Sequence, residues 1–293
     1  MRLLGIAHCS ILGIVLLASC DGAATPSPAP PSASPHPMSA SSSIAGVPGY
    51  PSSIVVLAHS GATGEDSDPS QPGIEVRENS WATGTNPDVQ SLYLRILAKN
   101  PAMEGHNVNL AHGSATVQDL VIQAEQAVEL EPVPDLVVIQ IMDADIACPA
   151  DDRDYASFRT TFQEALTLLT EGAPDADIFV VSQFGSPDTY ANSLTVAERK
   201  ASGGTGPCAF IGPDGKIVPK ELQRLEDIIL GYEAQLEAGC QRFERCHYDN
   251  GAFGRVVDRR SYLSSDLNHF SIEGHTKAAA VAWAGLQRAD IVP

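Results

Sequence analysis

The chain has 293 residues, and its 36 Asp and Glu against 18 Lys and Arg give a formal net charge of −18 at pH 7. So acidic a chain is a poor partner for nucleic acid or for an anionic lipid surface, because both would repel it. We therefore expect no nucleic-acid partner and interpret the charge as a source of solubility outside the cell.

The first 20 residues have the pattern of a secretory signal, in which Arg2 precedes an apolar stretch and small residues follow it. The apolar stretch is too short for a stable transmembrane span. It ends in the sequence LASC at 17–20, which resembles a bacterial lipobox, so we predict a signal peptide over 1–19 and lipidation of Cys20. This predicts an exported lipoprotein on the extracytoplasmic side of the bacterial cell membrane. An ordinary signal peptide would instead give a secreted protein.

Residues 20–50 are dominated by Pro, Ser and Ala and contain almost no bulky apolar side chain. Such a segment cannot bury enough surface to offset the entropy lost on ordering, so we predict a disordered tether. The remaining residues, 51–293, are enough for one substantial domain.

Apolar runs alternate with amphipathic segments through this domain. Continuous apolar runs predict buried strands, and apolar side chains at helical spacing predict helices. Thr116, with Asp119 three residues later, is a typical helix start. The alternation predicts an α/β domain with a parallel sheet covered on both faces. The predicted strands are 54–58, 107–111, 135–142 and 177–183, and the predicted helices are 89–99, 116–130, 155–170, 219–237 and 273–287.

Four cysteines lie in the predicted domain, and an even number in an exported chain suggests disulfides. Three pairings are open. We favour Cys240–Cys246 with Cys148–Cys208, because Cys240 and Cys246 are close in sequence. Zinc is a weaker interpretation, since no CxxC pair is present.

Polar residues follow the predicted strands where functional loops of parallel sheets lie. Ser60 follows the first strand, Gly113 the second, and Asp266 and His269 precede the last helix. A serine hydroxyl needs a base to take its proton, and an acid must orient the histidine that does so. Backbone N–H groups of Ser60 and Gly113 could stabilise an oxyanion. The set predicts acyl-transfer chemistry.

From Ile54 to the last helix, the chain resembles the SGNH (GDSL-type) hydrolase family. That family's first block, GDSxxxG, is AHSGATG at 58–64, which keeps the serine and the last glycine. Its second block carries an Asn and an oxyanion-hole glycine, which Asn109 and Gly113 match. Its last block, DxxH, is kept by Asp266 and His269.

The resemblance implies a three-layer α/β/α sandwich with a flavodoxin-like parallel sheet. It also implies a serine esterase with Ser60 as nucleophile and Asp266 and His269 as the acid and base. The oxyanion hole would use Ser60 and Gly113. No cofactor and no metal are implied. The substrate would be a small-molecule, lipid or acylated-carbohydrate ester.

Two departures from the family pattern affect this expectation. Gly-Asp before the serine is replaced by Ala58 and His59, and the third block, GxND, reads MDAD at 142–145. Ala144 therefore stands where the family has the asparagine that donates to the oxyanion, and losing such a donor costs about 10²–10³ in rate. A catalytically weak or inactive binding module at the cell surface is the alternative function.

Several polar residues near the predicted site are candidates for contacting substrate. They are His59, Asn109, His112, Asp143 and Asn268. No HxH or HExxH spacing supports a metal interpretation of the histidines. The acidic segment EDSD at 65–68 is interpreted as a solvated loop, with a calcium site as the alternative.

Overall fold

A computed structural model describes residues 45–202 and 207–293. The predicted signal peptide, Cys20 and the tether up to residue 44 lie outside the described residues. Residues 45–50, predicted as tether, contact the domain, because the Val47 N–H donates to Asn100 Oδ1 at 3.1 Å. The folded part therefore starts before residue 51. No helix within the described ranges is long and apolar enough to span a bilayer.

The centre of the domain is a parallel sheet of five strands in the order β2-β1-β3-β4-β5. Both faces of the first, third and fourth strands are covered, which explains their continuous apolar sequences. The order also brings the loops after β1, β2 and β3 to one edge of the sheet. The strands are β1 Ile54–Ala58, β2 Asn107–Asn109, β3 Leu136–Gln140, β4 Asp177–Val180 and β5 Cys246–Tyr248.

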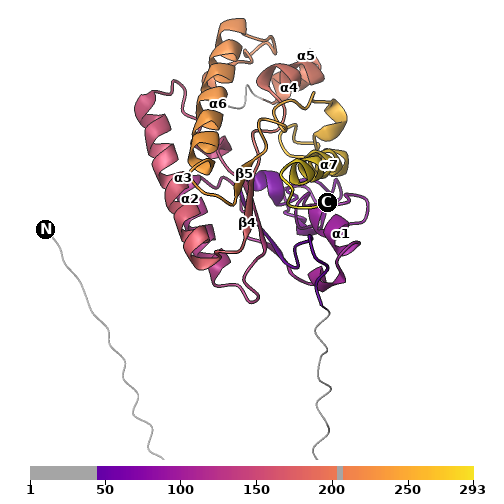
Figure 1. Cartoon of the computed structure of the whole chain (residues 1–293). Helices are drawn as coiled ribbons and strands as arrows, with labels where there is room; N and C mark the ends of the chain where they lie inside the picture. Colours follow the sequence, from indigo (N-terminus) through magenta and orange to yellow (C-terminus); the bar gives the residue numbers. More distant parts are fainter. Residues whose placement is uncertain (1–44, 203–206) are drawn as a thin grey trace, which may run out of the picture. The chain divides into compact units, whose positions relative to one another are not determined.

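Helices cover both faces of the sheet (Figure 1), as the sequence predicted. On one face, side chains of α2, α3 and α6 pack against Val55 and Leu57 of β1. On the other, α1 and α7 pack against Ile54, Val56 and Ala58. The helices are α1 Leu92–Leu97, α2 Val117–Val128, α3 Asp152–Gly172, α4 Pro187–Ser193, α5 Val196–Ala201, α6 Pro219–Cys240 and α7 Ile272–Arg288.

The predicted helix starts are partly confirmed. Thr116 and Asp119 form the expected reciprocal cap of α2. Asp151 caps α3, which starts three residues before the predicted Tyr155, because Asp154 completes a second reciprocal cap there. The strand β5 and the short helices α4 and α5 were not predicted, since each is too short to show a clear hydrophobic period.

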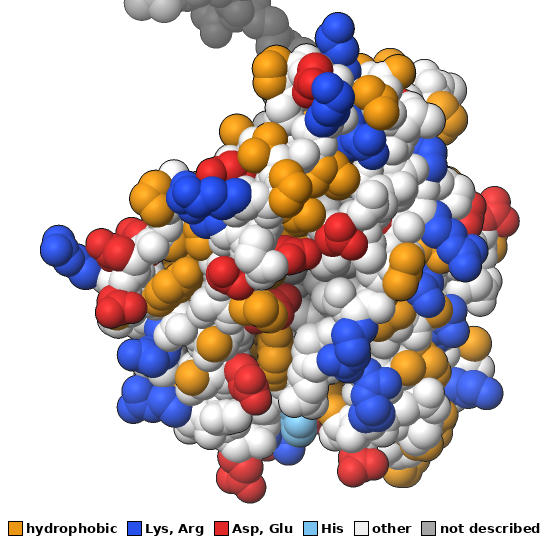
Figure 2. Space-filling view, turned by 90° about the horizontal axis from the view of Figure 1, so that it is seen from above, with side chains coloured by type: hydrophobic (Ala, Val, Ile, Leu, Met, Phe, Trp, Pro, Cys, Tyr) orange, Lys and Arg blue, Asp and Glu red, His pale blue; other side chains and the backbone are white. Residues whose placement is uncertain are grey.

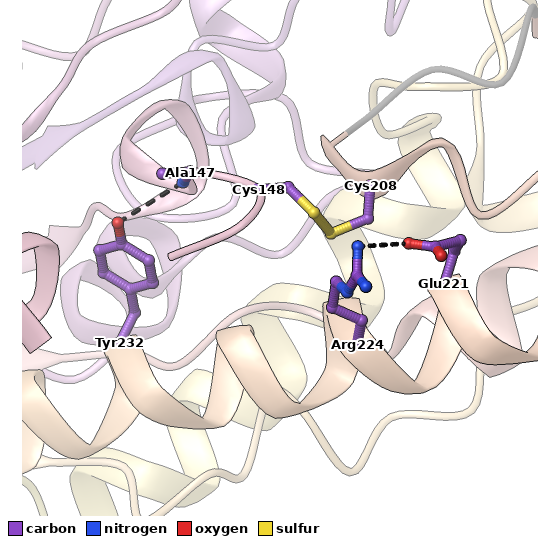
Figure 3. Close-up of a disulfide and its surroundings, with 6 residues drawn as sticks. All are labelled: Ala147, Cys148, Cys208, Glu221, Arg224 and Tyr232. Carbon is purple, nitrogen blue, oxygen red and sulfur yellow. Dashed lines mark hydrogen bonds and ion pairs between the residues drawn. A yellow bond between two sulfur atoms is a disulfide. The ribbon is translucent and has the colours of Figure 1, made fainter. Parts of the chain in front are cut away.

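Two disulfides are formed, Cys148–Cys208 and Cys240–Cys246, in the favoured pairing. Figure 3 shows the first beside α6, where Tyr232 reaches the loop that follows β3. The Tyr232 hydroxyl donates to Asp145 O at 2.8 Å and lies 3.5 Å from Ala147 N. The disulfide and α6 together fix the loop after β3, which borders the candidate site.

Candidate active site

Ser60 opens a short 3-10 turn directly after β1. His59 caps this turn, because its Nδ1 accepts a hydrogen bond from Gly61 N–H at 3.0 Å. A Cβ at Gly61 would lie 2.8 Å from His59 Cε1 and 2.9 Å from Gln140 Nε2, so only glycine fits there without a shift. The turn thus holds Ser60 at the mouth of a buried strand through contacts of its two neighbours.

Asp266 and His269 form a close pair on the turn before α7. Asp266 Oδ2 lies 2.6 Å from His269 Nδ1. The other carboxylate oxygen, Oδ1, accepts hydrogen bonds from the backbone N–H groups of Asn268 and His269 at 2.9 and 3.0 Å. The Ser264 hydroxyl donates to the same oxygen. The DxxH spacing therefore produces an oriented imidazole through local bonds.

These contacts set the charge of the pair. Burial alone would raise the pKa of Asp266, but the hydrogen bonds from His269, Ser264 and the backbone hold it far below its usual range. Burial lowers the pKa of His269. The hydrogen bond and charge of Asp266 and the charges of Glu65 and Asp66 raise it by more, so the pKa of His269 lies above its usual value of 6.5. Asp266 is ionised and favours the protonated imidazole.

Glu65 and Asp66 also face His269, which the sequence did not predict. Glu65 Oε2 lies 3.3 Å from His269 Nε2, and Asp66 Oδ2 lies 3.9 Å from Nδ1. Both acidic side chains are partly buried and Ser67 between them and Asp68 is buried, so the interpretation of residues 65–68 as a solvated loop was wrong. The chain turns back at Asp66, whose Oδ1 accepts the Gly73 N–H at 2.6 Å. That turn brings the loop over the histidine.

The same three side chains are the candidate metal ligands of the described residues. Ligand atoms of Glu65, Asp66 and His269 lie within 4.8 Å of one another. One of the histidine nitrogens, Nδ1, is already bonded to Asp266 at 2.6 Å. Three carboxylates, of Glu65, Asp66 and Asp266, therefore surround the imidazole, and their charges raise its pKa.

Ser60 and His269 line one cavity of about 330 Å³. His59, Asp143 and Asn268, three of the predicted substrate-contacting residues, line it as well. Within the described ranges, no hydrogen bond joins the Ser60 hydroxyl to His269, whose Nε2 lies beside Glu65. Catalytic hydrogen bonds are often long before substrate binds, so this geometry is compatible with a resting nucleophile and base.

The remaining walls of this cavity are largely apolar. Figure 2, a view from above, shows acidic side chains near a hollow in the middle of the surface, with hydrophobic side chains beside them. The cavity is of a size that fits a small ligand. Its apolar lining is Ile146, Phe184, Pro187, Tyr190, Pro207, Phe210, Leu225, Ile229, Leu263 and Phe270.

The backbone N–H groups predicted for the oxyanion hole are unused in the described structure. Neither Ser60 N–H nor Gly113 N–H donates a hydrogen bond to another described residue. Gly113 lies beside Glu65, since a Cβ there would be 3.7 Å from Glu65 Oε2. Both groups remain available to a ligand.

The loop after β3 contains a residue, Met142, with a positive φ of the kind that glycine usually adopts. Met142 has a φ of 144°, in the left-handed region, which costs a non-glycine residue about 1–3 kcal/mol. Asp143 accepts a hydrogen bond from Gln183 Nε2 at 3.2 Å. Asp145 accepts the Val117 N–H at the start of α2, and burial raises its pKa to about 6. Ala144, between these two carboxylates, has no side-chain amide.

Two predicted substrate-contacting residues lie outside the lining of this cavity. Asn109 Nδ2 donates to Ala62 O at 2.9 Å, and its Oδ1 accepts the Ala111 N–H. His112 is half-exposed, with Nε2 3.8 Å from Asp119. Asn109 therefore ties β2 to the turn that carries Ser60, and His112 lies near α2. A role of either residue in contacting substrate stays a prediction.

Gln140 is a cavity residue that sequence reasoning missed. It ends β3, where its backbone oxygen accepts the His59 N–H at 3.2 Å, and its Oε1 accepts the Trp81 indole N–H at 3.1 Å. A buried glutamine at the end of an apolar strand was the available sequence signal. Its contact with Trp81, 59 residues away in sequence, could be recognised only from the fold.

Comparisons with known proteins support the fold and little more. No protein-family model matches the chain, and no curated protein matches it. The solved structure of TesA aligns with 80% of this chain and 98% of its own length, at 13% identity and a TM-score of 0.51. The fold is that of an SGNH hydrolase.

Other solved structures are more distant in shape. An acetyl-xylooligosaccharide esterase, Axe2 from Geobacillus, is 16% identical over 80% of this chain and 93% of its own, with a TM-score of 0.48. The acetyl xylan esterase AlAXEase is 14% identical over 80% of this chain and 99% of its own, with a TM-score of 0.44.

Proposed function

We propose that the domain is a serine esterase that hydrolyses carboxylic esters through an acyl-enzyme on Ser60. One observation carries the proposal: Ser60 lines the same cavity as His269, and His269 is oriented by Asp266 at 2.6 Å. A nucleophile and a base in one cavity, with an acid that orients the base, are the parts that acyl transfer requires.

In the proposed reaction, Ser60 Oγ attacks the ester carbonyl carbon while His269 Nε2 takes its proton. Asp266 stabilises the imidazolium that results. The tetrahedral intermediate collapses as the carbon–oxygen bond to the alcohol breaks, and His269 returns the proton to the leaving oxygen. A water molecule then attacks the acyl-enzyme while His269 accepts a proton from it. As the bond between the acyl carbon and Ser60 Oγ breaks, His269 returns this proton to Oγ, which releases the acid and free Ser60.

The cavity favours esters with an apolar acyl group of modest size. Its walls beyond Ser60 are built largely from apolar side chains, among them Phe184, Phe210 and Phe270. The free energy of binding should therefore become more favourable with each buried methylene, by about 0.8 kcal/mol. Substrate assays should include p-nitrophenyl acetate, butyrate and octanoate to find where this gain stops.

The test is ester turnover by the purified protein and its Ser60→Ala variant. We expect turnover by the unaltered protein, a loss of at least about 10⁴-fold in Ser60→Ala, and labelling of Ser60 by a fluorophosphonate. Turnover that survives Ser60→Ala would rule out the assigned nucleophile. Ser114, in the loop after β2, provides a matched serine control, because it lies outside the lining of this cavity.

A binding module that has lost efficient chemistry is the second candidate. Two observations favour it: the Glu65 carboxylate lies 3.3 Å from the nitrogen that must accept the serine proton, and Ala144 lacks the amide of the family. Absence of both turnover and fluorophosphonate labelling, with ligand binding retained in calorimetry, would favour this function.

We also propose that the protein is exported and anchored through Cys20. The LASC sequence at 17–20 supports the proposal, and the two disulfides suit an oxidising compartment outside the cytoplasm. Metabolic labelling with an alkynyl fatty acid should mark the full chain but not its Cys20→Ala variant. Release of unlabelled wild-type protein into the medium would instead indicate a secreted protein.

A further inference from the structure

We propose that His59 replaces the missing asparagine of the oxyanion hole, donating a hydrogen bond through its Nε2–H group. The inference rests on the proposed esterase function, because only acyl transfer forms the oxyanion. His59 follows β1 and directly precedes Ser60, and both residues line the same cavity.

The hydrogen bond to Gly61 fixes the tautomer of His59. Gly61 N–H donates to Nδ1 at 3.0 Å, so Nδ1 must present a lone pair. In a neutral imidazole the proton then lies on Nε2. The bond that caps the nucleophile turn therefore also makes Nε2 a donor.

The surroundings keep this imidazole neutral. His59 is 7% exposed, and burial lowers its pKa below 6.5. The charge of Asp143 acts in the opposite direction, and the charge of His269 lowers the pKa further. A neutral imidazole next to the reacting centre can donate to a developing oxyanion without itself losing a proton.

The Nε2–H group is also unused. Among the described residues it has no hydrogen-bond or ion-pair partner, although Asp143 is close enough to affect the charge of the ring. A donor in the cavity wall with no protein partner is available to a ligand. Ser60 N–H is unused in the same way, so two adjacent residues of the cavity lining, His59 and Ser60, each offer a donor.

On this proposal, the first departure from the family pattern, His59, compensates for the second, Ala144. Where the family has an acidic residue before the serine and an asparagine after β3, this chain has His59 and Ala144. His59 accepts the Gly61 N–H as an acidic side chain could, and it adds an N–H donor of its own. Ala144 has no polar side chain, so the hydrogen bond to the oxyanion would come from His59 instead.

The test uses His59→Asp, Ala144→Asn and the double variant. Aspartate at 59 can still accept the Gly61 N–H but carries no donor when ionised. We expect His59→Asp to lower kcat about 10²–10³-fold with little change in KM. Ala144→Asn alone should change kcat less than about threefold, while the double variant should recover at least about tenfold over His59→Asp.

A second readout separates a catalytic from a structural role. Affinity for a trifluoromethyl ketone, whose adduct carries the oxyanion, should fall in His59→Asp and return in the double variant. Thermal unfolding of all variants shows that they are folded. Loss of kcat in His59→Asp without recovery by Ala144→Asn would overturn the proposal, as would a loss in Gln140→Leu with none in His59→Asp.

The outcomes distinguish this inference from the proposed function. Absence of Ser60-dependent turnover in the unaltered protein would overturn both. Ser60-dependent turnover that His59→Asp leaves at full rate would overturn only the role of His59.

Discussion

The two sides of the candidate site are built in different ways. On the acid–base side, His269 and Asp266 share one tight turn, and Glu65 and Asp66 add two further carboxylates around the imidazole. On the side of the proposed oxyanion hole, Ser60 follows β1, Gly113 follows β2 and Ala144 follows β3.

The difference bears on how the chain resembles the SGNH pattern. The acid–base pair lies three residues apart on one turn, and its geometry depends on local hydrogen bonds to the Asp266 carboxylate. An oxyanion hole made from several loops needs only a donor at the right place, which a neighbouring element can supply. The chain has the DxxH spacing of that pattern but lacks GDS and GxND.

The largest effect should come from breaking the acid–base side. We expect Asp266→Asn to lower kcat about 10⁴-fold, since an amide cannot hold the imidazole in the correct tautomer or stabilise its charge. Hydrolysis of p-nitrophenyl butyrate measures the loss, and circular dichroism serves as the folding control. A loss below tenfold would contradict the role assigned to Asp266.

Removing the Cys148–Cys208 disulfide should test the other side, because this disulfide anchors the loop after β3. Its cysteines are 60 residues apart, against 6 for Cys240–Cys246. Loop entropy predicts about 4 kcal/mol lost from the free energy of unfolding for the first and about 2 kcal/mol for the second.

Denaturant unfolding of the two double Ser variants, each lacking one disulfide, measures this difference. The variant without Cys148–Cys208 should also lose activity, because Pro207 and Phe210 line the cavity next to that disulfide. The pH midpoint of its kcat/KM should stay constant, since His269 is oriented by Asp266 and not by this disulfide. Equal stability losses in the two variants would contradict the assignment of different anchoring roles.

The smallest effect concerns the extra carboxylates. Because the pKa of His269 is raised above 6.5 and the base must be neutral, kcat/KM should fall as pH drops through that raised value. Glu65→Gln removes a negative charge that favours the imidazolium, so the midpoint should move to lower pH, by roughly one pH unit. The exposed Glu125→Gln is the matched control, and an unchanged midpoint in Glu65→Gln would show that Glu65 does not act on the base.

Much of the fold could be predicted because its signals are local. The buried strands β1, β3 and β4 are continuous apolar runs, and the reciprocal cap at Thr116 follows from residues three apart. The strand β5 has only three residues and carries no period of its own. It forms because β4 offers it an edge.

The sequence by itself determined the nucleophile candidate, the acid–base pair and the favoured disulfides, since each depends on residue type, order or spacing. Tertiary structure decided what surrounds them. Glu65 contacts His269 across more than 200 residues of sequence, and Asp145 binds the start of α2 rather than facing the cavity. The tautomer of His59 depends on a turn whose bond to Gly61 no spacing rule reveals. Such contacts follow from how loops converge at the edge of the sheet, which pattern alone does not specify.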